Sequence, residues 1–361
     1  MGSLERRDLT WPLAVGAVLL LVLAGCGLAF GGMVKSALAP DDFEGRGQGE
    51  AMVRIEPGQS AREVGTALEE KGVVASDDAF IKAVEGSARA AALRPGLYRL
   101  RREMKAADAL GLLFDPAARV QRKVTVREGL RLDETLTVLA RGSGIPRAEF
   151  AKAAADPSDL GLPSYADGRL EGFLFPATYP IEPGQDAKAV LAAMVRRFRQ
   201  AAADLDLESR AEAVRLTPLQ AVTMGSIAQA EGGTAADYPK ISRVVYNRLE
   251  SGGRLQLDTT VLYAQRRHDL RVSESDTRVD SPYNTYTNDG LPPGPISNPG
   301  EAALKGALNP ARGDWTFFVT TDPKNRVTRY TASESEFVRF REELNRALDA
   351  MRDQPFPTRR P

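Results

Sequence analysis

One glutamate in this sequence stands where an acid catalyst is favoured. The segment from Thr217-Pro218 to Glu231 reads as a helix, because Thr217 and Gln220 form a capping box and proline occupies the first helical position. Gly232-Gly233 marks its end. The negative end of a helix dipole disfavours a further negative charge, so the Glu231 carboxyl is biased towards its protonated form. A solvated glutamate at a fraying helix end would show the same local pattern.

Two polar segments downstream of Glu231 carry side chains that bind sugars. The first contains Gln256 and Asp258, and the second, rich in Asn, Tyr, Thr and Pro, contains Asn284 and Tyr286. Amide and carboxylate groups bind hydroxyl and acetamido groups, and prolines hold such groups in place before a ligand arrives. An irregular segment of this length is usually functional, although an ordered surface loop would look similar. We therefore expect Gln256, Asp258, Asn284 and Tyr286 to bind substrate.

The composition excludes several other chemistries. Lys plus Arg equals Asp plus Glu at 48 each in 361 residues, so no basic field attracts nucleic acid. Cys26 is the only cysteine and His268 the only histidine, which excludes an internal disulfide and a zinc site built from Cys and His. His268 lies in a polar stretch typical of a surface. We expect no metal and no cofactor.

The N-terminal region predicts a membrane anchor. Residues 12–34 contain no charge and are long enough to cross a hydrocarbon core as a helix, leaving residues 1–11 as a short cytoplasmic tail. Leu23-Ala24-Gly25-Cys26 resembles a bacterial lipobox, at which a lipoprotein is cut and its cysteine acylated. Apolar residues continue past Cys26, so we expect an uncut, unlipidated helix. The protein would then be a single-pass protein of the cytoplasmic membrane with its folded part outside the cytoplasm.

The rest of the chain divides into a linker, two folded regions and a tail. Residues 35–50 have the acidic and glycine-rich composition of a linker. Residues 51–118 follow the order strand, helix, helix, strand, which resembles a LysM-type carbohydrate-binding module. Residues 119–351 are largely helical with a few strands, and 352–361 form a disordered tail. The predicted fold class is α+β.

A short pattern occurs twice in the folded part. Residues 53–58, Val-Arg-Ile-Glu-Pro-Gly, correspond to residues 124–129, Val-Thr-Val-Arg-Glu-Gly. A second copy would end in residues 170–179, which parallel the turn and strand at 94–100. A duplicated unit and two convergent strand-turn-helix segments both explain this pattern.

Six motifs together connect the chain to a known family. They are Leu170-Glu171-Gly172-Phe173-Leu174-Phe175-Pro176, Ser226-Ile227-Ala228-Gln229-Ala230-Glu231, Asn247-Arg248-Leu249, Leu255-Gln256-Leu257-Asp258, Tyr283-Asn284-Thr285-Tyr286 and Gly290-Leu291-Pro292-Pro293-Gly294. With them the chain resembles the YceG-like endolytic murein transglycosylases, the MltG family, over nearly its whole length.

The resemblance implies an enzyme that cuts nascent peptidoglycan strands, leaves 1,6-anhydro-N-acetylmuramic acid ends and so limits strand length. It places the catalytic glutamate on Glu231, implies glycan strands as the partner and leaves open a cell-wall synthase as another. Some relatives carry a second acid where this chain has Gln229, and histidines where it has Thr328 and Phe337. The roles of those groups are therefore not carried over.

Two other functions stay open on the sequence. A hydrolytic muramidase needs a second carboxylate, for which Asp258 and Asp289 are available. A non-catalytic peptidoglycan-binding scaffold for a cell-wall synthase would not need Glu231. Lytic cleavage needs one carboxyl only, with Asp258 and Glu171 as structural partners.

Overall fold

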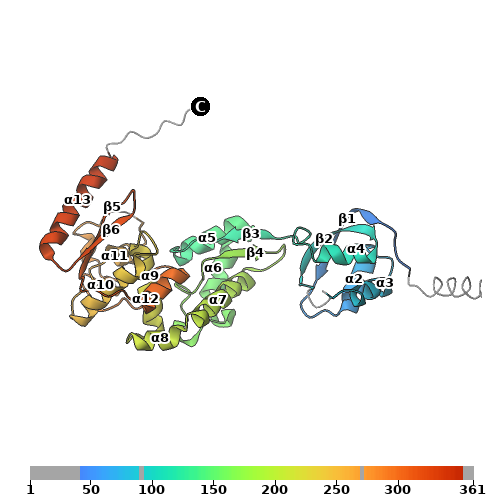
Figure 1. The fold of residues 1–361 in the computed structure, drawn as a ribbon, viewed down its shortest axis with the longest axis horizontal. Coiled ribbons are helices and arrows are strands. Elements are labelled where there is room, and N and C mark those ends of the chain that lie inside the picture. Colours follow the sequence, from blue (N-terminus) through green and yellow to red (C-terminus); the bar gives the residue numbers. More distant parts are fainter. Residues whose placement is uncertain (1–40, 89–92, 269–271, 353–361) are drawn as a thin grey trace, which may run out of the picture. The chain divides into compact units, whose positions relative to one another are not determined.

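The computed structural model describes residues 41–88, 93–268 and 272–352, and Figure 1 follows the chain through them. The chain divides into two compact units, residues 1–121 and residues 122–361. Within the described residues, helices combine with three two-stranded antiparallel sheets. The predicted mixture of helices and small sheets is confirmed.

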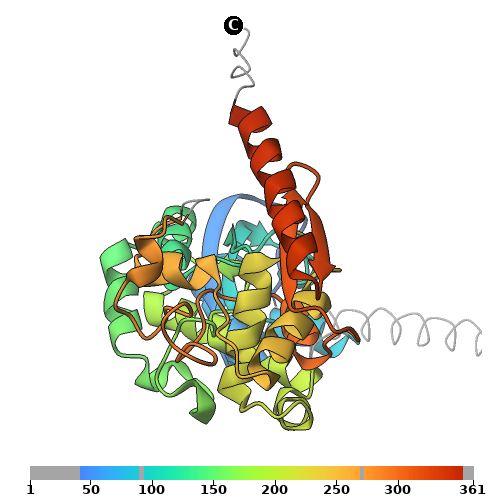
Figure 2. The same cartoon turned by 90° about the vertical axis from the view of Figure 1, so that its left-hand side faces the viewer.

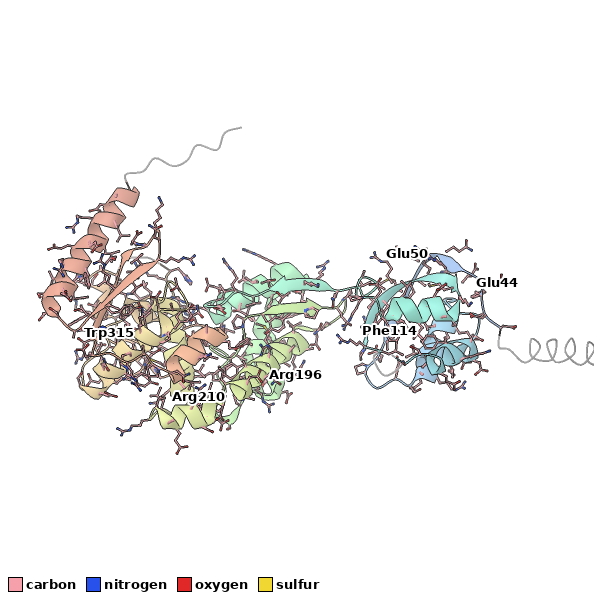
Figure 3. The ribbon with its side chains drawn as sticks, viewed as in Figure 1. Glu44, Glu50, Phe114, Arg196, Arg210 and Trp315 are labelled. Carbon is pink, nitrogen blue, oxygen red and sulfur yellow. The ribbon has the colours of Figure 1, made fainter. Side chains whose placement is uncertain are left out.

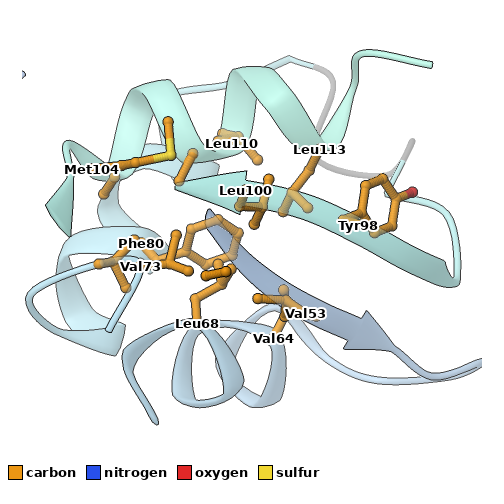
Figure 4. Close-up of a cluster of buried hydrophobic side chains, with 14 of the residues drawn as sticks. Val53, Val64, Leu68, Val73, Phe80, Tyr98, Leu100, Met104, Leu110 and Leu113 are labelled. Carbon is orange, nitrogen blue, oxygen red and sulfur yellow. The ribbon is translucent and has the colours of Figure 1, made fainter. Parts of the chain in front are cut away.

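The first unit has the predicted order of strand, helix, helix, strand. Its elements are β1 Arg46–Ile55, α2 Ala61–Glu70, α3 Asp77–Glu85, β2 Gly96–Met104 and α4 Ala106–Leu113. Strands β1 and β2 pair antiparallel, and the helices cover one face of the pair. Leu68, Phe80 and Leu100 are fully buried between helices and sheet, as Figure 4 shows. The likeness to LysM modules remains a prediction.

Strand β1 begins inside the range that the sequence assigned to a linker. It starts at Arg46, and Gly47 and Gly49 adopt positive φ, with Gly49 inside the bulge between Gln48 and Ala51. Upstream of the strand, the Asp42 carboxylate accepts a hydrogen bond from the Ala106 amide at 2.9 Å. The linker prediction is therefore wrong for residues 46–50, because glycines that shape a bulged strand have the composition of a flexible tether.

The second unit opens with another strand, helix, helix, strand arrangement. Its elements are β3 Arg122–Thr125, α5 Leu132–Ser143, α6 Arg147–Ala155 and β4 Thr178–Ile181. Val124 pairs with Tyr179 as Val53 pairs with Tyr98. Each tyrosine hydroxyl donates to the carbonyl oxygen four residues earlier, at 2.7 Å for Tyr98 and 2.6 Å for Tyr179. The shared order, register and tyrosine contact favour a duplicated unit over convergence.

The remaining elements include one buried helix. They are α7 Ala187–Asp204, α8 Leu207–Ala213, α9 Pro218–Glu231, α10 Tyr238–Glu250, α11 Asp258–Ala264, α12 Glu301–Leu308, β5 Phe317–Asp322, β6 Val327–Thr331 and α13 Glu334–Arg352. Residues 221–228 of α9 are all buried, and α9 packs against α8, α10, α11 and α12. Gly225 allows α12 to pack closely, because a Cβ there would lie 3.0 Å from Leu304 Cδ2. Figure 2 shows α13 beside the β5–β6 hairpin.

The predicted anchor cannot be followed in the structure. Residues 12–34, with Cys26, lie outside the described residues, as does nearly all of the predicted tail. No helix among the described residues combines the length and apolar character needed to cross a membrane.

Candidate active site

Helix α9 ends at Glu231, as the sequence predicts, and this end of the helix lines a cleft. Thr217 and Gln220 cap its first turn reciprocally, at 3.2 Å and 2.9 Å. Glu231 is its last residue and lines a cleft of about 830 Å³. The other lining residues come from the end of β3 with the residues that follow it (125–128), the approach to β4 (176–178), the C-terminal turn of α9 with Tyr238, and the β5–β6 hairpin (Thr320, Pro323, Arg326).

The Glu231 carboxyl group is largely shielded from water and is held by Thr259. The Thr259 hydroxyl donates to its Oε1 at 2.6 Å. Burial raises the pKa of Glu231 to about 7, against the lowering effects of Thr259 and Arg248, while the charge of Asp258 raises it further. The direction expected from the helix end is confirmed, but the main physical cause is burial. A carboxyl with this pKa can both donate and accept a proton near neutral pH.

Arg248 adds positive charge near this carboxyl without pairing with it. Its Nε donates to the Thr316 carbonyl at 2.7 Å and its Nη1 donates to the Leu255 carbonyl. Its guanidinium also lies over the Phe317 ring, 5.7 Å from the centroid. The two carbonyls fix Arg248 between α10, the 254–257 segment and the last sheet.

Gln229 and Gly232 support the cleft structurally. The Gln229 amide donates to the Tyr238 hydroxyl at 2.7 Å and accepts from the Gly300 amide at 3.0 Å, which ties α9 to the start of α12. A Cβ on Gly232 would lie 2.6 Å from a Tyr238 ring carbon. Glycine follows α9 because Tyr238 fills that space, since Gly232 itself has an extended backbone with negative φ.

A sequence model of the YceG-like family matches residues 53–343. The chain belongs to the YceG-like family. An endolytic murein transglycosylase of Bacillus subtilis is 30% identical over 78% of this chain and 82% of its own length. One of Streptococcus pneumoniae is 30% identical over 89% of this chain, which spans 63% of the pneumococcal protein. A crystal structure of a YceG-like protein from Listeria monocytogenes covers 81% of this chain and 99% of its own, at 28% identity and a TM-score of 0.55.

Two of the four substrate-binding residues expected in this YceG-like chain meet beside the carboxyl of Glu231. The Tyr286 hydroxyl donates to Asp258 Oδ1 at 2.6 Å. Asp258 is exposed at the start of α11, directly before the Thr259 that hydrogen-bonds Glu231. Tyr286 and Asp258 therefore lie at the edge of the site and remain candidates for contact with a sugar.

The other two expected residues differ from each other. Gln256 is exposed and its backbone has φ of 49°, with its amide held by the Thr285 carbonyl at 3.0 Å. Its side chain makes no hydrogen bond to any part of the chain that the structure describes. Asn284, by contrast, is fully buried. Its amide donates to the carbonyls of Thr277 and Val279 and accepts from the Tyr286 amide.

Asn284 is therefore a correction to the sequence analysis. No part of its side chain is accessible to a sugar, and every contact that its amide makes braces the loop. Asparagine carries the same donor and acceptor groups whether it faces a ligand or the backbone of its own turn, so sequence cannot separate the two roles.

Glu171 shows why a raised pKa does not by itself identify a catalyst. Burial raises its pKa to about 7 as well. Its carboxyl accepts from the Leu132 amide at 2.9 Å and 3.1 Å and from the Tyr263 hydroxyl at 3.3 Å, and it does not line the cleft. This agrees with the structural role expected of Glu171, which joins the start of α5 to α11.

Sequence reasoning missed several residues of the site. Thr259 comes directly after the motif Leu255–Asp258, and Arg248 belongs to the motif Asn247–Leu249, so both lie in or next to segments that the sequence already marks. Glu128 and Arg127 line the cleft from the repeated 124–129 segment, which was read only as a fold signal. At the two positions where the family resemblance led us to expect histidine, Thr328 contacts cleft-lining Thr320 at 3.2 Å and Phe337 stacks on Phe317.

Proposed function

We propose that this chain is an endolytic murein transglycosylase, which cuts the MurNAc-GlcNAc bond of peptidoglycan strands and leaves 1,6-anhydroMurNAc ends. The observation that carries the proposal is a carboxyl group, Glu231, whose pKa burial raises to about 7 and which lines a cleft large enough for a glycan segment. Membership of a family with curated relatives named for this activity supports it.

Glu231 acts first as general acid. Its proton passes to the oxygen that links the muramyl anomeric carbon to the next sugar, that bond breaks, and the anomeric carbon becomes oxocarbenium-like. Burial keeps the carboxyl protonated at a pH where a solvated glutamate would be ionised, so the proton is available. After transfer, the new carboxylate is stabilised by the Thr259 hydroxyl and by the positive charge of Arg248.

Glu231 then acts as general base. The 6-hydroxyl of the same muramyl residue attacks its own anomeric carbon, and the carboxylate removes the hydroxyl proton as the 1,6-anhydro bond forms. Because the nucleophile is tethered to the reacting ring, no water and no second carboxylate are required. The carboxyl returns to its starting, protonated state, and no atom is exchanged with solvent.

The residues at the edge of the site bind the sugar rather than transfer protons. We assign Gln256, Asp258 and Tyr286 to contacts with hydroxyl and acetamido groups, because Asp258 and Tyr286 meet near Glu231 and the Gln256 side chain is exposed two residues before Asp258. Tyr286 holds Asp258 at 2.6 Å, which fixes the carboxylate in one orientation before substrate arrives.

The cellular setting belongs to the same proposal. Residues 12–34 anchor the protein in the cytoplasmic membrane as one helix, Cys26 stays unlipidated, and the folded part lies outside the cytoplasm. There it limits the length of nascent strands, with a cell-wall synthase as a partner, and the first unit, residues 51–118, binds glycan as a LysM-like module.

Mass spectrometry of digested peptidoglycan tests the activity and separates its rivals. The wild-type protein is expected to release products with anhydro ends, Glu231→Gln to release almost none, and Asp258→Asn to lose less. Reducing ends would indicate a hydrolase, with Asp258 as the second carboxylate. If neither wild type nor Glu231→Gln released any product, the non-catalytic scaffold would remain as the function.

A further inference from the structure

Two arginines line the cleft from segments far apart in the sequence, and the proposed reaction uses neither. Arg127 follows the end of β3, and Arg326 ends the turn between β5 and β6. Both are exposed. Across the part of the chain that the structure describes, neither makes an ion pair or a side-chain hydrogen bond. Surface arginines are often paired, so two unpaired guanidinium groups in one cleft are available to a ligand.

Both arginines are held close to the catalytic helix end. The Arg326 Cβ would lie only 3.0 Å from a Cβ on Gly233, two residues after Glu231, so the turn of the last sheet closes against the end of α9. Arg326 itself has φ of 56°, which the tight turn imposes. Arg127 follows Val126, whose amide is bound to the Ala177 carbonyl at 2.9 Å. These contacts fix the backbone positions from which the two arginine side chains extend.

The cleft also carries negative charge, which limits the classes of ligand that can bind there. Glu128 lines it next to Arg127, and its carboxylate lies against Gly300, where an added Cβ would be 2.1 Å away. The Glu128 carboxylate would repel a polyanion such as a nucleic acid or polyphosphate. A ligand with separate carboxylate and amino groups matches a cleft with two cations and two carboxyl groups.

We propose that Arg127 and Arg326 bind the carboxylates of the peptide stem carried by muramyl residues, so that the protein selects stem-bearing strands. This inference rests on the proposed function. The stem is attached through the lactyl group of the same muramyl ring whose anomeric carbon reacts at Glu231, so it leaves the strand within one sugar of that carboxyl. Arginine forms two parallel hydrogen bonds with a carboxylate, which suits recognition of a flexible peptide.

The test compares three substrates with the same sugar sequence. These are strands carrying stems, strands freed of stems by an amidase and then amidated at the lactyl carboxylates that this cleavage exposes, and stem-bearing strands whose carboxylates have been amidated. The proteins are wild type, Arg127→Gln/Arg326→Gln, Arg127→Lys/Arg326→Lys and the matched control Arg196→Gln. Arg196 is exposed on α7 (Figure 3) and does not line the cleft. The readout is kcat/KM for release of products.

We expect the double glutamine variant to have a kcat/KM about 10- to 30-fold lower than wild type on stem-bearing strands. This corresponds to about 3- to 5-fold for each partly exposed charge pair. Its kcat/KM on the other two substrates should equal that of wild type. The double lysine variant should recover part of the loss because it keeps both charges, and Arg196→Gln should match wild type throughout. Raised salt should reduce the wild-type preference for stem-bearing strands.

An equal loss on all three substrates, or no loss on any, would overturn the inference and leave the proposed activity intact. Unchanged circular dichroism and melting temperature exclude a folding defect as the source of an equal loss. If wild type cleaves none of the substrates, the proposed function itself fails, and the inference that rests on it falls too.

Discussion

Replacing Glu231 by Gln tests the catalytic assignment through both activity and stability. The change keeps the shape of the side chain and an oxygen that can accept from Thr259, but it removes the transferable proton. We expect kcat/KM to fall by about 10² to 10⁴, the range for loss of a general acid-base group, with glycan binding retained. A fall of this size with secondary structure unchanged separates proton transfer from a folding defect.

The stability effect has the opposite sign and depends on pH. In the folded protein the pKa of Glu231 is about 7, and its ordinary value is 4.5. The folded state therefore binds more protons than the unfolded state between these values. The contribution of Glu231 to the free energy of unfolding is therefore fully present below pH 4.5 and is lost as the pH rises through about 7. The pKa difference of about 2.5, at about 1.36 kcal/mol for each pKa unit, gives a loss of at most about 3 to 4 kcal/mol, and residual solvent contact reduces this loss to about 1 to 3 kcal/mol.

Glutamine carries no such penalty, so Glu231→Gln should be more stable than wild type at pH 8 and nearly equal to it at pH 4.5. Denaturant unfolding at both pH values measures the difference. Glu171 also titrates near 7, but it is present in both proteins and its contribution cancels. For the wild-type enzyme, kcat/KM should decline as pH rises through 7, because the acid must be protonated.

Two results would refute this reasoning. If Glu231→Gln destabilised the protein equally at both pH values, the carboxyl would not be held neutral by burial. If the variant kept near wild-type release of anhydro products while Asp258→Asn abolished it, a different carboxylate would be the catalyst.

Three further changes have definite expected results. Tyr286→Phe removes the hydroxyl bound to Asp258 and should lower kcat/KM by about 2- to 10-fold, as measured by glycan release. Thr259→Val removes the bond that lowers the pKa of Glu231, so the alkaline limb of the pH–rate profile should move to higher pH. Asn298→Ala leaves two buried backbone amides without their acceptor and should reduce the free energy of unfolding by about 2 to 4 kcal/mol, as measured by chemical denaturation.

Local interactions explain why parts of the fold were predictable from sequence. The capping box of Thr217 and Gln220 and the end of α9 at Glu231 involve residues within one helical turn. The second strand-helix-helix-strand unit was predictable as a repeat because the short pattern of residues 53–58 recurs at residues 124–129, and the structure shows the same strand pairing and tyrosine contact in both units. The linker prediction was wrong at residues 46–50, because the glycines there belong to a bulged strand, and only the pairing of β1 with β2 reveals that strand.

The sequence by itself determined the family motifs, the mixed fold, and the glutamate at the end of a capped helix, because these depend on residue identity and short-range spacing. Tertiary structure decided what surrounds that glutamate. Thr259 meets it across 28 residues of sequence, and Asn284 turned inward to brace its own loop. The two walls that carry Arg127 and Arg326 come from strands about 200 residues apart. Burial, which sets the proton affinity of Glu231, is produced by the packing of these distant segments and has no local sequence signal.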